Sequence, residues 1–469
     1  MSSDHLPPLP QGVIDAETLT RLVDTGRIDT VVMAFPDLQG RLMGKRLTGR
    51  YFLEHVLTSA TVGGVEVCNY LLALDVDMTP LPGFAFANWD RGYGDMVCRP
   101  DLSTLRVVPW LEGTALVLCD VFDEDTGAPV EVAPRRILQR QIERAAALGL
   151  TVMGGSELEF FLFRDSYEEA EAKGFSDLTY HSAVNLDYHV FQTTRDEYLI
   201  RQIRNGMDAA GIEVEFSKGE ASLGQHEINL RYTDALGMAD RHVIYKNGAK
   251  EIAAANGRAL TFMAKYDMEQ CGSSCHVHSS VWSTDGGGSL MWSDDDPDHL
   301  SPTFRGWLGG LLAHARELTW CFAPTVNSYK RFQPGSWAPT GIAWGRDNRT
   351  CGFRVVGHGA GARVECRIPG ADANPYLAFA ATIAAGLDGI ERGLDPGPAF
   401  VGNAYEATDV PRVPWNIVEA TDAFAGSTLA AAAFGADVHE HLVNVARQEW
   451  TAFASVVTDW ERRRNFVQF

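Results

Sequence analysis

Two glutamates stand two positions apart in an extended apolar segment, where they could hold a cation. Residues 151–163, TVMGGSELEFFLF, predict a β-strand, and alternate side chains of a strand point to the same face. Glu157 and Glu159 therefore project together, about 7 Å apart, and repel each other by about 2 kcal/mol at an effective dielectric constant near 20. A divalent cation beside them would remove this cost, although a solvated strand face is the alternative interpretation of the pair alone.

The same alternate spacing recurs in later segments of the chain. His276 and His278 share a face in SCHVHSS, Glu365 lies in ARVECRI, and Glu220 and Glu227 enclose ASLGQH. Each segment alone is typical of a structural role. Taken together, five acids and a histidine on strands or strand edges offer oxygen and imidazole ligands, which suit hard divalent ions such as Mg²⁺ or Mn²⁺.

Two cysteines near these histidines offer a zinc site as a competing interpretation. Cys271 and Cys275 precede His276 and His278 in CGSSCHVH. If residues 274–280 form a strand, however, Cys275 and His276 face opposite sides of the sheet, so the four ligands cannot converge. The sequence therefore favours cations held by the acids.

A basic cluster follows in NSYKRF and RDNRTCGFR and continues with Arg363 and Arg367. Several arginines close to acid-held metals are typical of a site for phosphates and carboxylates. The sequence contains neither a Walker A motif nor GxGxxG. If ATP is used, metals and arginines must therefore hold its phosphates in place of a glycine-rich loop.

The whole chain has the length and composition of a large globular protein. It has 469 residues and a net charge of −21, which disfavours nucleic-acid and membrane partners because both need clustered Lys and Arg. No run of 18 apolar residues predicts a transmembrane helix, and the N-terminal MSSDHLPPLPQG lacks the features of a secretion signal. Eight scattered cysteines without CxxC predict reduced thiols, so we expect a cytoplasmic protein.

Three regions are expected to position the candidate residues. Residues 1–15 predict a disordered tail, residues 16–116 a small β-rich domain, and residues 117–469 the domain that carries the candidate site. Helical patterns alternate irregularly with strand-like segments, most clearly at 239–257 and 374–393. This pattern predicts an α+β fold with a mainly antiparallel sheet.

These motifs, in this order, resemble those of the glutamine synthetase family. The resemblance extends from about residue 28 to the end of the sequence and rests on GGSELEFFLF, KGEASLGQHEINL, YKNGAKEIA, CGSSCHVHSS, NSYKRFQPGSWAP, RDNRTCGFR and RVECRIPGADANPYLAFAA. It implies that residues 16–116 form a β-grasp domain and residues 117–469 a catalytic domain with a mainly antiparallel, curved sheet. It also implies a homo-oligomer, a dodecamer of two hexameric rings with active sites between subunits.

The resemblance further implies an ATP-dependent ligase with two or three Mg²⁺ or Mn²⁺ ions in each site. In this chemistry ATP phosphorylates the γ-carboxylate of glutamate, and an amine then displaces phosphate from the γ-glutamyl phosphate. Glutamate, the amine and ATP are thus the expected small-molecule partners.

The family's functional positions match residues of this chain one by one. The matching metal ligands are Glu159, Glu220 and Glu227 for one ion and Glu157, His276 and Glu365 for another. The matching glutamate-binding residues are Glu159, Gly272, His276, Arg331 and Arg367. Arg349 and Arg354 match the catalytic arginines at the transferred phosphoryl group, and the matching ATP-binding residues are Glu215, His278, Ser280, Arg354 and Arg363.

Two departures concern the part of the site that binds ammonium in this family. The family's flap reads PGYEAP, with a glutamate that helps to deprotonate ammonium, whereas residues 334–339 read PGSWAP and place Trp337, a predicted catalytic residue, at that position. A segment like FDGSS, which carries the other ammonium-site acid, is absent from the sequence. A tryptophan cannot accept a proton, but it can enclose a larger, partly apolar substrate.

This combination resembles the branch of γ-glutamyl-ethanolamide and γ-glutamyl-polyamine synthetases. It predicts a ligase that joins the γ-carboxylate of glutamate to a small organic amine, with ethanolamine or a similar monoamine favoured over a polyamine. The alternatives are a true glutamine synthetase that uses ammonium and a non-catalytic structural or regulatory relative. Tyr405 falls near a position that is adenylylated in some members of the family, but its context GNAYEATD favours a plain surface tyrosine.

Overall fold

The N-terminal part of the chain folds around a mixed sheet. The computed structural model describes residues 8–58 and 63–469. The sheet has six strands in the order β2-β1-β6-β4-β3, with β5 beside β6. Strands β1 and β6 are parallel, and the other pairs are antiparallel. The bounds are β1 Thr30–Pro36, β2 Leu42–Thr48, β3 Val65–Cys68, β4 Asp95–Pro100, β5 Arg106–Val107 and β6 Thr114–Asp123. The apolar run TALVLC at the start of β6 is buried throughout, as expected of a central strand.

The predicted tail of residues 1–15 differs in part from the structure. Residues 1–7 lie outside the described residues. Val13, however, forms a β-bridge with Arg106, and Ile14 is buried. The prediction of a disordered tail therefore does not hold for the residues that immediately precede helix α1 (Ala16–Asp24).

The predicted domain boundary between residues 116 and 117 falls inside β6. All of β6 belongs to the N-terminal sheet, because it pairs with β1 along its first half and with β4 along its second. Helix α3 (Pro134–Ala147) then begins the second domain, so we place the boundary at 124–133. Buried Arg135 of α3 joins the two domains, since it forms ion pairs with Asp101 and Asp120 on one side and with Asp240 on the other.

The second domain contains a nine-stranded sheet with β7 near its middle. The main order is β13-β14-β15-β12-β7-β9-β8, and β10 and β11 also pair with β7. All pairs are antiparallel except β13 with β14, so the sheet is mainly antiparallel as predicted but is not purely so. The bounds are β7 Leu150–Phe163, β8 Val214–Gly219, β9 Gln225–Leu230, β10 Thr233–Asp234, β11 Ala259–Thr261, β12 Cys275–Ser283, β13 Trp344–Arg346, β14 Phe353–Val356 and β15 Arg363–Cys366.

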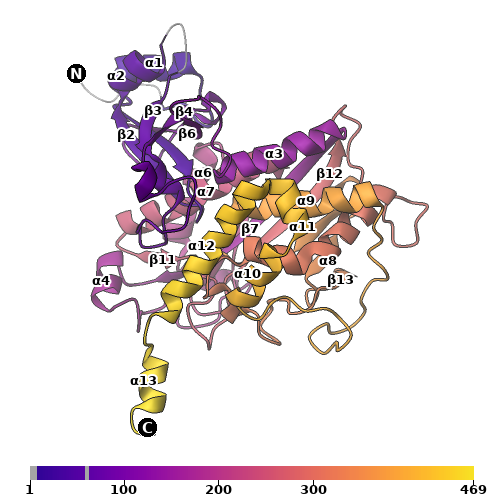
Figure 1. The fold of residues 1–469 in the computed structure, drawn as a ribbon. Coiled ribbons are helices and arrows are strands. Elements are labelled where there is room, and N and C mark those ends of the chain that lie inside the picture. Colours follow the sequence, from indigo (N-terminus) through magenta and orange to yellow (C-terminus); the bar gives the residue numbers. More distant parts are fainter. Residues whose placement is uncertain (1–7, 59–62) are drawn as a thin grey trace.

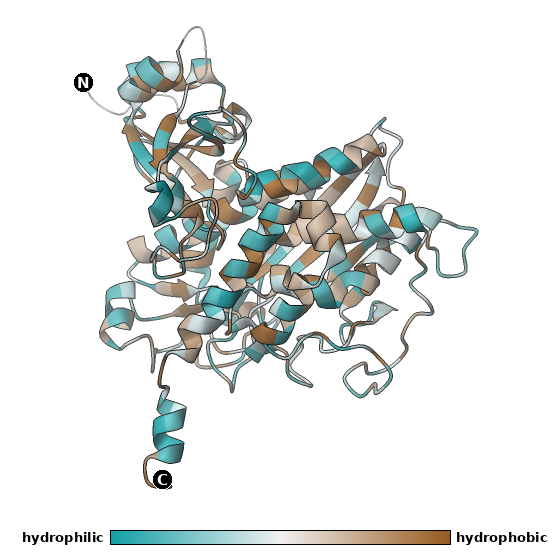
Figure 2. Ribbon diagram, in the orientation of Figure 1, coloured by the Kyte–Doolittle hydropathy of each residue, from teal (hydrophilic) through white to brown (hydrophobic). Residues whose placement is uncertain are grey.

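Helices cover one face of this sheet (Figure 1). Helices α3, α7 and α9 pack on strands β7 and β12, and α8 packs on α9. The bounds of the longer helices are α6 Glu197–Ala209, α7 Ala235–Ala255, α8 Pro302–Phe322, α9 Pro375–Arg392, α10 Ile417–Ala425 and α12 Ala436–Ala454, and the shorter ones are α2 Gly49–Tyr51, α4 Tyr167–Ala172, α5 Val190–Thr194, α11 Thr428–Phe434 and α13 Asp459–Asn465. Helix α9 is apolar along most of its length and almost entirely buried (Figure 2).

Alternation along β7 separates its two faces. A Cβ at Gly154 would meet the ring of Phe379 on α9, and Ser156 contacts His242 of α7. The even-numbered residues of this part of β7 therefore face the helices. Glu157 and Glu159 consequently face the opposite side of the sheet, which the helices leave open for a site.

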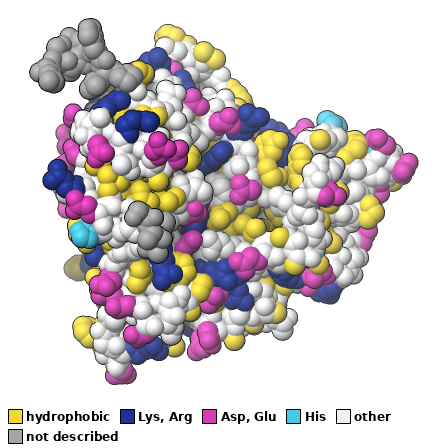
Figure 3. Space-filling model, turned by 90° about the horizontal axis from the view of Figure 1, so that it is seen from above, with side chains coloured by type: hydrophobic (Ala, Val, Ile, Leu, Met, Phe, Trp, Pro, Cys, Tyr) yellow, Lys and Arg dark blue, Asp and Glu magenta, His cyan; other side chains and the backbone are white. Residues whose placement is uncertain are grey.

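The exterior of the molecule, its cysteines and its last helix complete the description of the fold. On the face shown in Figure 3, positive and negative side chains are interspersed and form no single basic stripe. No helix within residues 8–58 and 63–469 is long and apolar enough to cross a bilayer. All eight cysteines are unpaired. Helix α13 projects away from the body of the molecule, as Figure 1 shows.

Candidate active site

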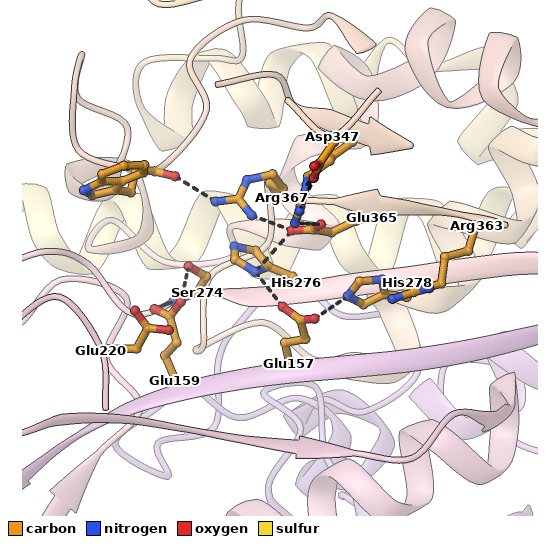
Figure 4. A network of polar contacts seen from close by, with 12 residues as sticks. Glu157, Glu159, Glu220, Ser274, His276, His278, Asp347, Arg363, Glu365 and Arg367 are labelled. Carbon is orange, nitrogen blue, oxygen red and sulfur yellow. Dashed lines mark hydrogen bonds and ion pairs between the residues drawn. The ribbon is translucent and has the colours of Figure 1, made fainter. Parts of the chain in front are cut away.

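The register of three strands assembles the first group of candidate residues. His276 of β12 lies opposite Glu157 of β7, and His278 of β12 lies opposite Glu365 of β15. Residues opposite each other on antiparallel strands project to the same face and contact one another. Figure 4 shows Glu157 between the two histidines, with Glu365 beyond His276.

Glu157, His276 and Glu365 form a group that could hold a metal ion. One ligand atom from each lies within 4.8 Å of the others. The Nδ1 atom of His276 is 3.2 Å from Glu157 Oε2 and 3.5 Å from Glu365 Oε1. The side chains of His276 and Glu365 are buried, so the group lies at the floor of the site.

Neighbouring basic side chains favour the ionised form of the carboxylates in this group. Burial alone would raise the pKa of Glu365, but His276 and Arg367 outweigh it and lower this pKa to about 2. Burial likewise opposes ionisation of Glu157, yet His278 and His276 hold its pKa well below the ordinary value. Two ionised carboxylates beside an imidazole are ready-made ligands for a divalent cation.

Glu159, Glu220 and Glu227 form a second group with the same ligand spacing. Glu227 of β9 lies opposite Glu159 of β7, and one oxygen from each of the three acids lies within 4.8 Å of the others. Burial and the charge of Glu220 raise the pKa of Glu159 to about 8, and burial with the neighbouring acids also raises the pKa of Glu227. Lys218 pairs with Glu220, but the crowding of the three acids still favours the protonated forms of Glu159 and Glu227 when no cation is bound.

Both groups offer the donor atoms that divalent cations prefer. Carboxylate oxygens with at most one imidazole suit Mg²⁺ or Mn²⁺ rather than zinc. The raised pKa values in the second group give an independent reason, since a cation there would offset the repulsion among three acids. Cys275, which the zinc interpretation required, instead places its Sγ 3.6 Å from Ser156 on the helix side of the sheet.

Two cavities meet at this row of residues. The larger site cavity, of about 540 Å³, is lined by all the predicted metal, glutamate-binding and catalytic residues: Glu157, Glu159, Glu220, Glu227, Gly272, His276, Arg331, Trp337, Arg349, Arg354, Glu365 and Arg367. The smaller site cavity, of about 230 Å³, is lined by the predicted ATP residues Glu215, His278, Ser280 and Arg363. Both cavities share Glu157 and Asn229, so a group transferred between them would pass the first acid group.

Arg354 belongs to the larger cavity rather than to the one that holds the other predicted ATP residues. Its Nη1 donates a hydrogen bond to Glu365 Oε2 at 2.8 Å, and its guanidinium also pairs with Asp347. Arg349 is exposed on the same wall. Of the two predicted catalytic arginines, Arg354 therefore contacts the first acid group directly, and Arg349 lies on the same wall of the larger cavity.

Arg331 and Gly272 form a rigid wall of the larger cavity. Arg331 is buried, and its two terminal nitrogens donate to the carbonyls of Ile368 and Arg367 at 2.7 and 2.8 Å. A Cβ at Gly272 would lie 2.6 Å from the Ala264 carbonyl oxygen and 2.6 Å from Arg331 Cγ. The backbone therefore approaches Arg331 at a place where only glycine fits.

The flap, residues 334–339, places its tryptophan in the larger cavity. Trp337 has a left-handed backbone with φ of 65°, and it is 58 % exposed. Its carbonyl accepts a hydrogen bond from Arg367 at 3.4 Å, and the next carbonyl, that of Ala338, accepts one from the Tyr405 hydroxyl at 2.9 Å. Tyr405 is thus half-buried against the flap, which corrects its prediction as a plain surface residue.

Sequence reasoning missed three residues that line the site. Asn229 lies opposite Glu157 and shares its face two positions after Glu227 on β9, so alternation along QHEINL could have identified it. Lys218 forms an ion pair with Glu220, and its ammonium lies 4.2 Å from the ring centroid of Tyr188. Tyr188 comes from an irregular segment, and nothing in its local sequence indicates that it lies beside the acids.

Comparison with known proteins decides the family. The pattern of the family described as "Glutamine synthetase, catalytic domain" matches residues 131–465. The chain belongs to the glutamine synthetase family. It is 52 % identical to the γ-glutamylethanolamide synthetase of Streptomyces coelicolor over 99 % of this chain and 97 % of that protein. It is 38 % identical to the glutamate–isopropylamine ligase of a Pseudomonas species, over 94 % of this chain and 96 % of the relative.

A solved structure resembles this chain over nearly its whole length. The "GmaS/ADP complex" superposes with a TM-score of 0.82 at 30 % identity and covers 96 % of this chain and 99 % of its own. The predicted α+β fold is therefore confirmed. Membership and the relatives also show that this glutamine synthetase homologue is an enzyme of the ligase class, which disfavours the non-catalytic alternative.

Proposed function

We propose that this enzyme joins the γ-carboxylate of glutamate to a small organic monoamine, such as ethanolamine, with hydrolysis of ATP to ADP and phosphate. The observation that carries the proposal is Trp337, whose indole is exposed on the wall of the cavity that holds both acid groups. In ammonium-using members an acid stands at this flap position. The names of two relatives, a γ-glutamylethanolamide synthetase and a glutamate–isopropylamine ligase, support a small organic amine as the nitrogen donor.

The residues at the junction of the cavities suit transfer of a phosphoryl group. ATP in the smaller cavity would place its terminal phosphate near Glu157, with Arg363 and His278 beside the nucleotide. The glutamate γ-carboxylate would attack that phosphorus from the larger cavity, ADP would leave, and the amine nitrogen would then displace phosphate. Two or three Mg²⁺ or Mn²⁺ ions, when bound by the two acid groups, would neutralise phosphate and carboxylate oxygens.

The four arginines that line the larger cavity have two different roles in this proposal. Arg349 and Arg354, which line the larger cavity, would stabilise the negative charge that gathers on the transferred phosphoryl group, because a guanidinium does so without a change in its own protonation. Arg331 is held by backbone carbonyls and faces the same cavity as Arg367. These two residues, with the close-packed backbone at Gly272, would fix the α-carboxylate end of glutamate.

A monoamine suits the larger cavity better than a polyamine. A second ammonium of a polyamine would need an unpaired carboxylate beyond the acid groups. Among the described residues that line this cavity, the acid outside the two groups is Asp187, and Lys218 lies 3.7 Å from it. The flap adds an apolar indole instead of a charge.

We also propose that the chain works as a cytoplasmic homo-oligomer, a dodecamer of two stacked rings. The projecting helix α13 and the residues that follow it carry large hydrophobic side chains: Trp460 of the helix is 63 % exposed, and Phe466 and Val467 after it are each 86 % exposed. Such side chains favour burial against another subunit. Analytical ultracentrifugation tests this assembly, and a monomer at micromolar concentration would refute it.

Phosphate release measured with a panel of nitrogen donors tests the function. Reactions contain ATP, Mg²⁺, glutamate and one of ammonium, ethanolamine, isopropylamine or putrescine, and mass spectrometry identifies the product amide. We expect the largest kcat/KM for a monoamine. A kcat/KM for ammonium equal to that of every organic amine would refute the proposal and favour a true glutamine synthetase.

A further inference from the structure

A third cavity lies outside the active site, where the N-terminal domain meets helices α7 and α12. This interdomain cavity has a volume of about 490 Å³ and shares no lining residue with the two site cavities. Its walls come from residues 38–42, from the loop around Asp75, and from α7 and α12. Hydrogen bonds from His441 and Asn444 of α12 to the N-terminal domain join the two domains near it.

Two lysines bring positive charge to the interdomain cavity. Lys246 and Lys250 of α7 both line it, and their ammonium groups lie 5.5 and 5.9 Å from the ring centroid of Phe262. Lys246 donates one hydrogen bond, to the carbonyl of Ala371 at 2.8 Å, which leaves two of its three protons without an acceptor among the described residues. The indole N–H of Trp320, on the same lining, also has no hydrogen-bond partner there.

Acids line the same cavity without pairing with these lysines. Asp372 uses Oδ2 to accept hydrogen bonds from Thr325 and Ser328, while its Oδ1 is buried and has no partner among the described residues. Glu449 accepts one hydrogen bond from the backbone N–H of Val326. Within the described part of the chain, no ion pair joins either acid to Lys246 or Lys250.

The pKa values of Lys246, Lys250 and Glu449 are shifted as expected of charged groups that lack a partner of opposite charge. Burial and the charge of Lys250 lower the pKa of Lys246 to about 8, and burial with nearby Arg41 lowers the pKa of Lys250. Burial, aided by Asp372 and other acids, raises the pKa of Glu449. Each group would gain from a ligand that brings the opposite charge.

The remaining lining sets the character of the ligand between the charged groups. Much of it is apolar, with Leu42, Leu81, Val243, Trp320 and Val445 among its residues, and the charged side chains of Arg41, Asp75 and Asp77 lie at the end formed by the N-terminal domain. A cavity with apolar walls and a few convergent polar groups of shifted pKa is the usual form of a small-molecule site. Lys246 hydrogen-bonds the carbonyl of Ala371, and the charge of the next residue, Asp372, acts on the pKa of this lysine, so a cation and a carboxylate lie near each other in this wall without forming an ion pair.

We propose that the interdomain cavity binds a free α-amino acid with an apolar side chain. Its carboxylate would meet Lys246 and Lys250, its ammonium would meet Asp372 and Glu449, and its side chain would lie against the apolar walls. An α-amino acid carries its two charges on adjacent groups, as the neighbouring cation and acceptor of this wall require. The site is independent of the reaction proposed above, because it shares no residue with the catalytic cavities.

Isothermal titration of the full-length protein with L-phenylalanine, in the absence of ATP and glutamate, tests this site. We expect one phenylalanine per chain. Phenethylamine, which lacks the carboxylate, and 3-phenylpropionate, which lacks the ammonium, should each bind at least tenfold more weakly. Lys250→Met and Glu449→Gln should each weaken phenylalanine binding at least tenfold, whereas Lys173→Met, a lysine outside the cavity, and Trp337→Ala should leave it unchanged.

Three results would overturn the proposal. The first is the absence of any binding heat with phenylalanine, leucine or tryptophan in the millimolar range. The second is binding that Trp337→Ala abolishes, which would place the ligand in the catalytic site. The third is binding seen only after removal of residues 456–469, which would show that a second copy of the chain fills the cavity. Melting temperatures of the variants separate a lost contact from a lost fold.

Discussion

Replacing Trp337 by alanine should weaken binding of the amine more than binding of the other substrates. A tryptophan offers about 250 Å² of surface, so an exposed fraction of 58 % leaves about 145 Å² accessible to solvent. If a bound amine covers about half of that area, burial contributes about 1.8 kcal/mol at 25 cal/mol per Å². This free energy corresponds to a KM for the amine that is about 20-fold higher in the variant.

The assay is steady-state phosphate release with the best amine from the panel. KM is measured separately for ATP, glutamate and the amine, and size-exclusion chromatography runs beside it. The values for ATP and glutamate should change less than threefold, since the nucleotide cavity does not contain Trp337. Trp415→Ala is the matched control, because Trp415 is 45 % exposed and lines neither site cavity.

A companion variant tests the chemical side of the same reasoning. Trp337→Glu should lower kcat/KM for the monoamine and raise it for ammonium, because a carboxylate would then face the attacking nitrogen. The reasoning would be refuted if Trp337→Ala changed all three KM values alike, or if it altered the oligomer. Either result would mean that the indole serves the stability of the flap rather than recognition of the amine.

Four further changes test other parts of the site. Glu365→Gln should lower kcat at least 100-fold at saturating Mn²⁺ with an unchanged circular dichroism spectrum, and full activity would refute its role as a metal ligand. Because the pKa of Glu159 is raised to about 8, the folded metal-free protein holds one more proton than the unfolded chain between about pH 4.5 and 8, and it loses stability as pH rises through that window. Mn²⁺ should therefore raise Tm more at pH 8 than at pH 6. Equal shifts in Tm at the two pH values would contradict this. Gly272→Ala should raise KM for glutamate more than tenfold, since a Cβ would lie 2.6 Å from Arg331 Cγ, and a KM equal to wild type would show that the backbone yields. Tyr405→Phe removes one hydrogen bond to the flap, about 1 kcal/mol, and should raise the amine KM about fivefold without changing that for ATP.

Alternation along strands explains why so much of the site could be predicted. Glu157 and Glu159 face away from the helices because residues 154 and 156 face them, and a period of two leaves no other arrangement. The same argument applies to His276 and His278. What alternation alone could not give is the strand order that brings β15 beside β12, because pairing between distant segments depends on the complete fold.

The domain boundary and the residues outside regular strands were the harder part of the prediction. The domain boundary at residue 116 was misplaced because the apolar run of β6 continues past it, and its burial depends on both β1 and β4. Tyr405 lies in an irregular segment, so nothing local indicates that its hydroxyl reaches the carbonyl of Ala338, 67 positions away. Tyr188 was missed for the same reason.

The two acid groups differ in how the protein prepares them for a cation. In the first group, arginine and histidine neighbours already compensate Glu157 and Glu365, so their pKa values are low and the carboxylates are ionised before any metal arrives. In the second, Glu159 and Glu227 crowd Glu220 with less compensation, and their pKa values are raised. A cation therefore relieves more repulsion in the second group but must displace protons to do so. The carboxylates of the first group need lose no proton when a cation binds, which suits a position at the junction where phosphate oxygens pass from one cavity to the other.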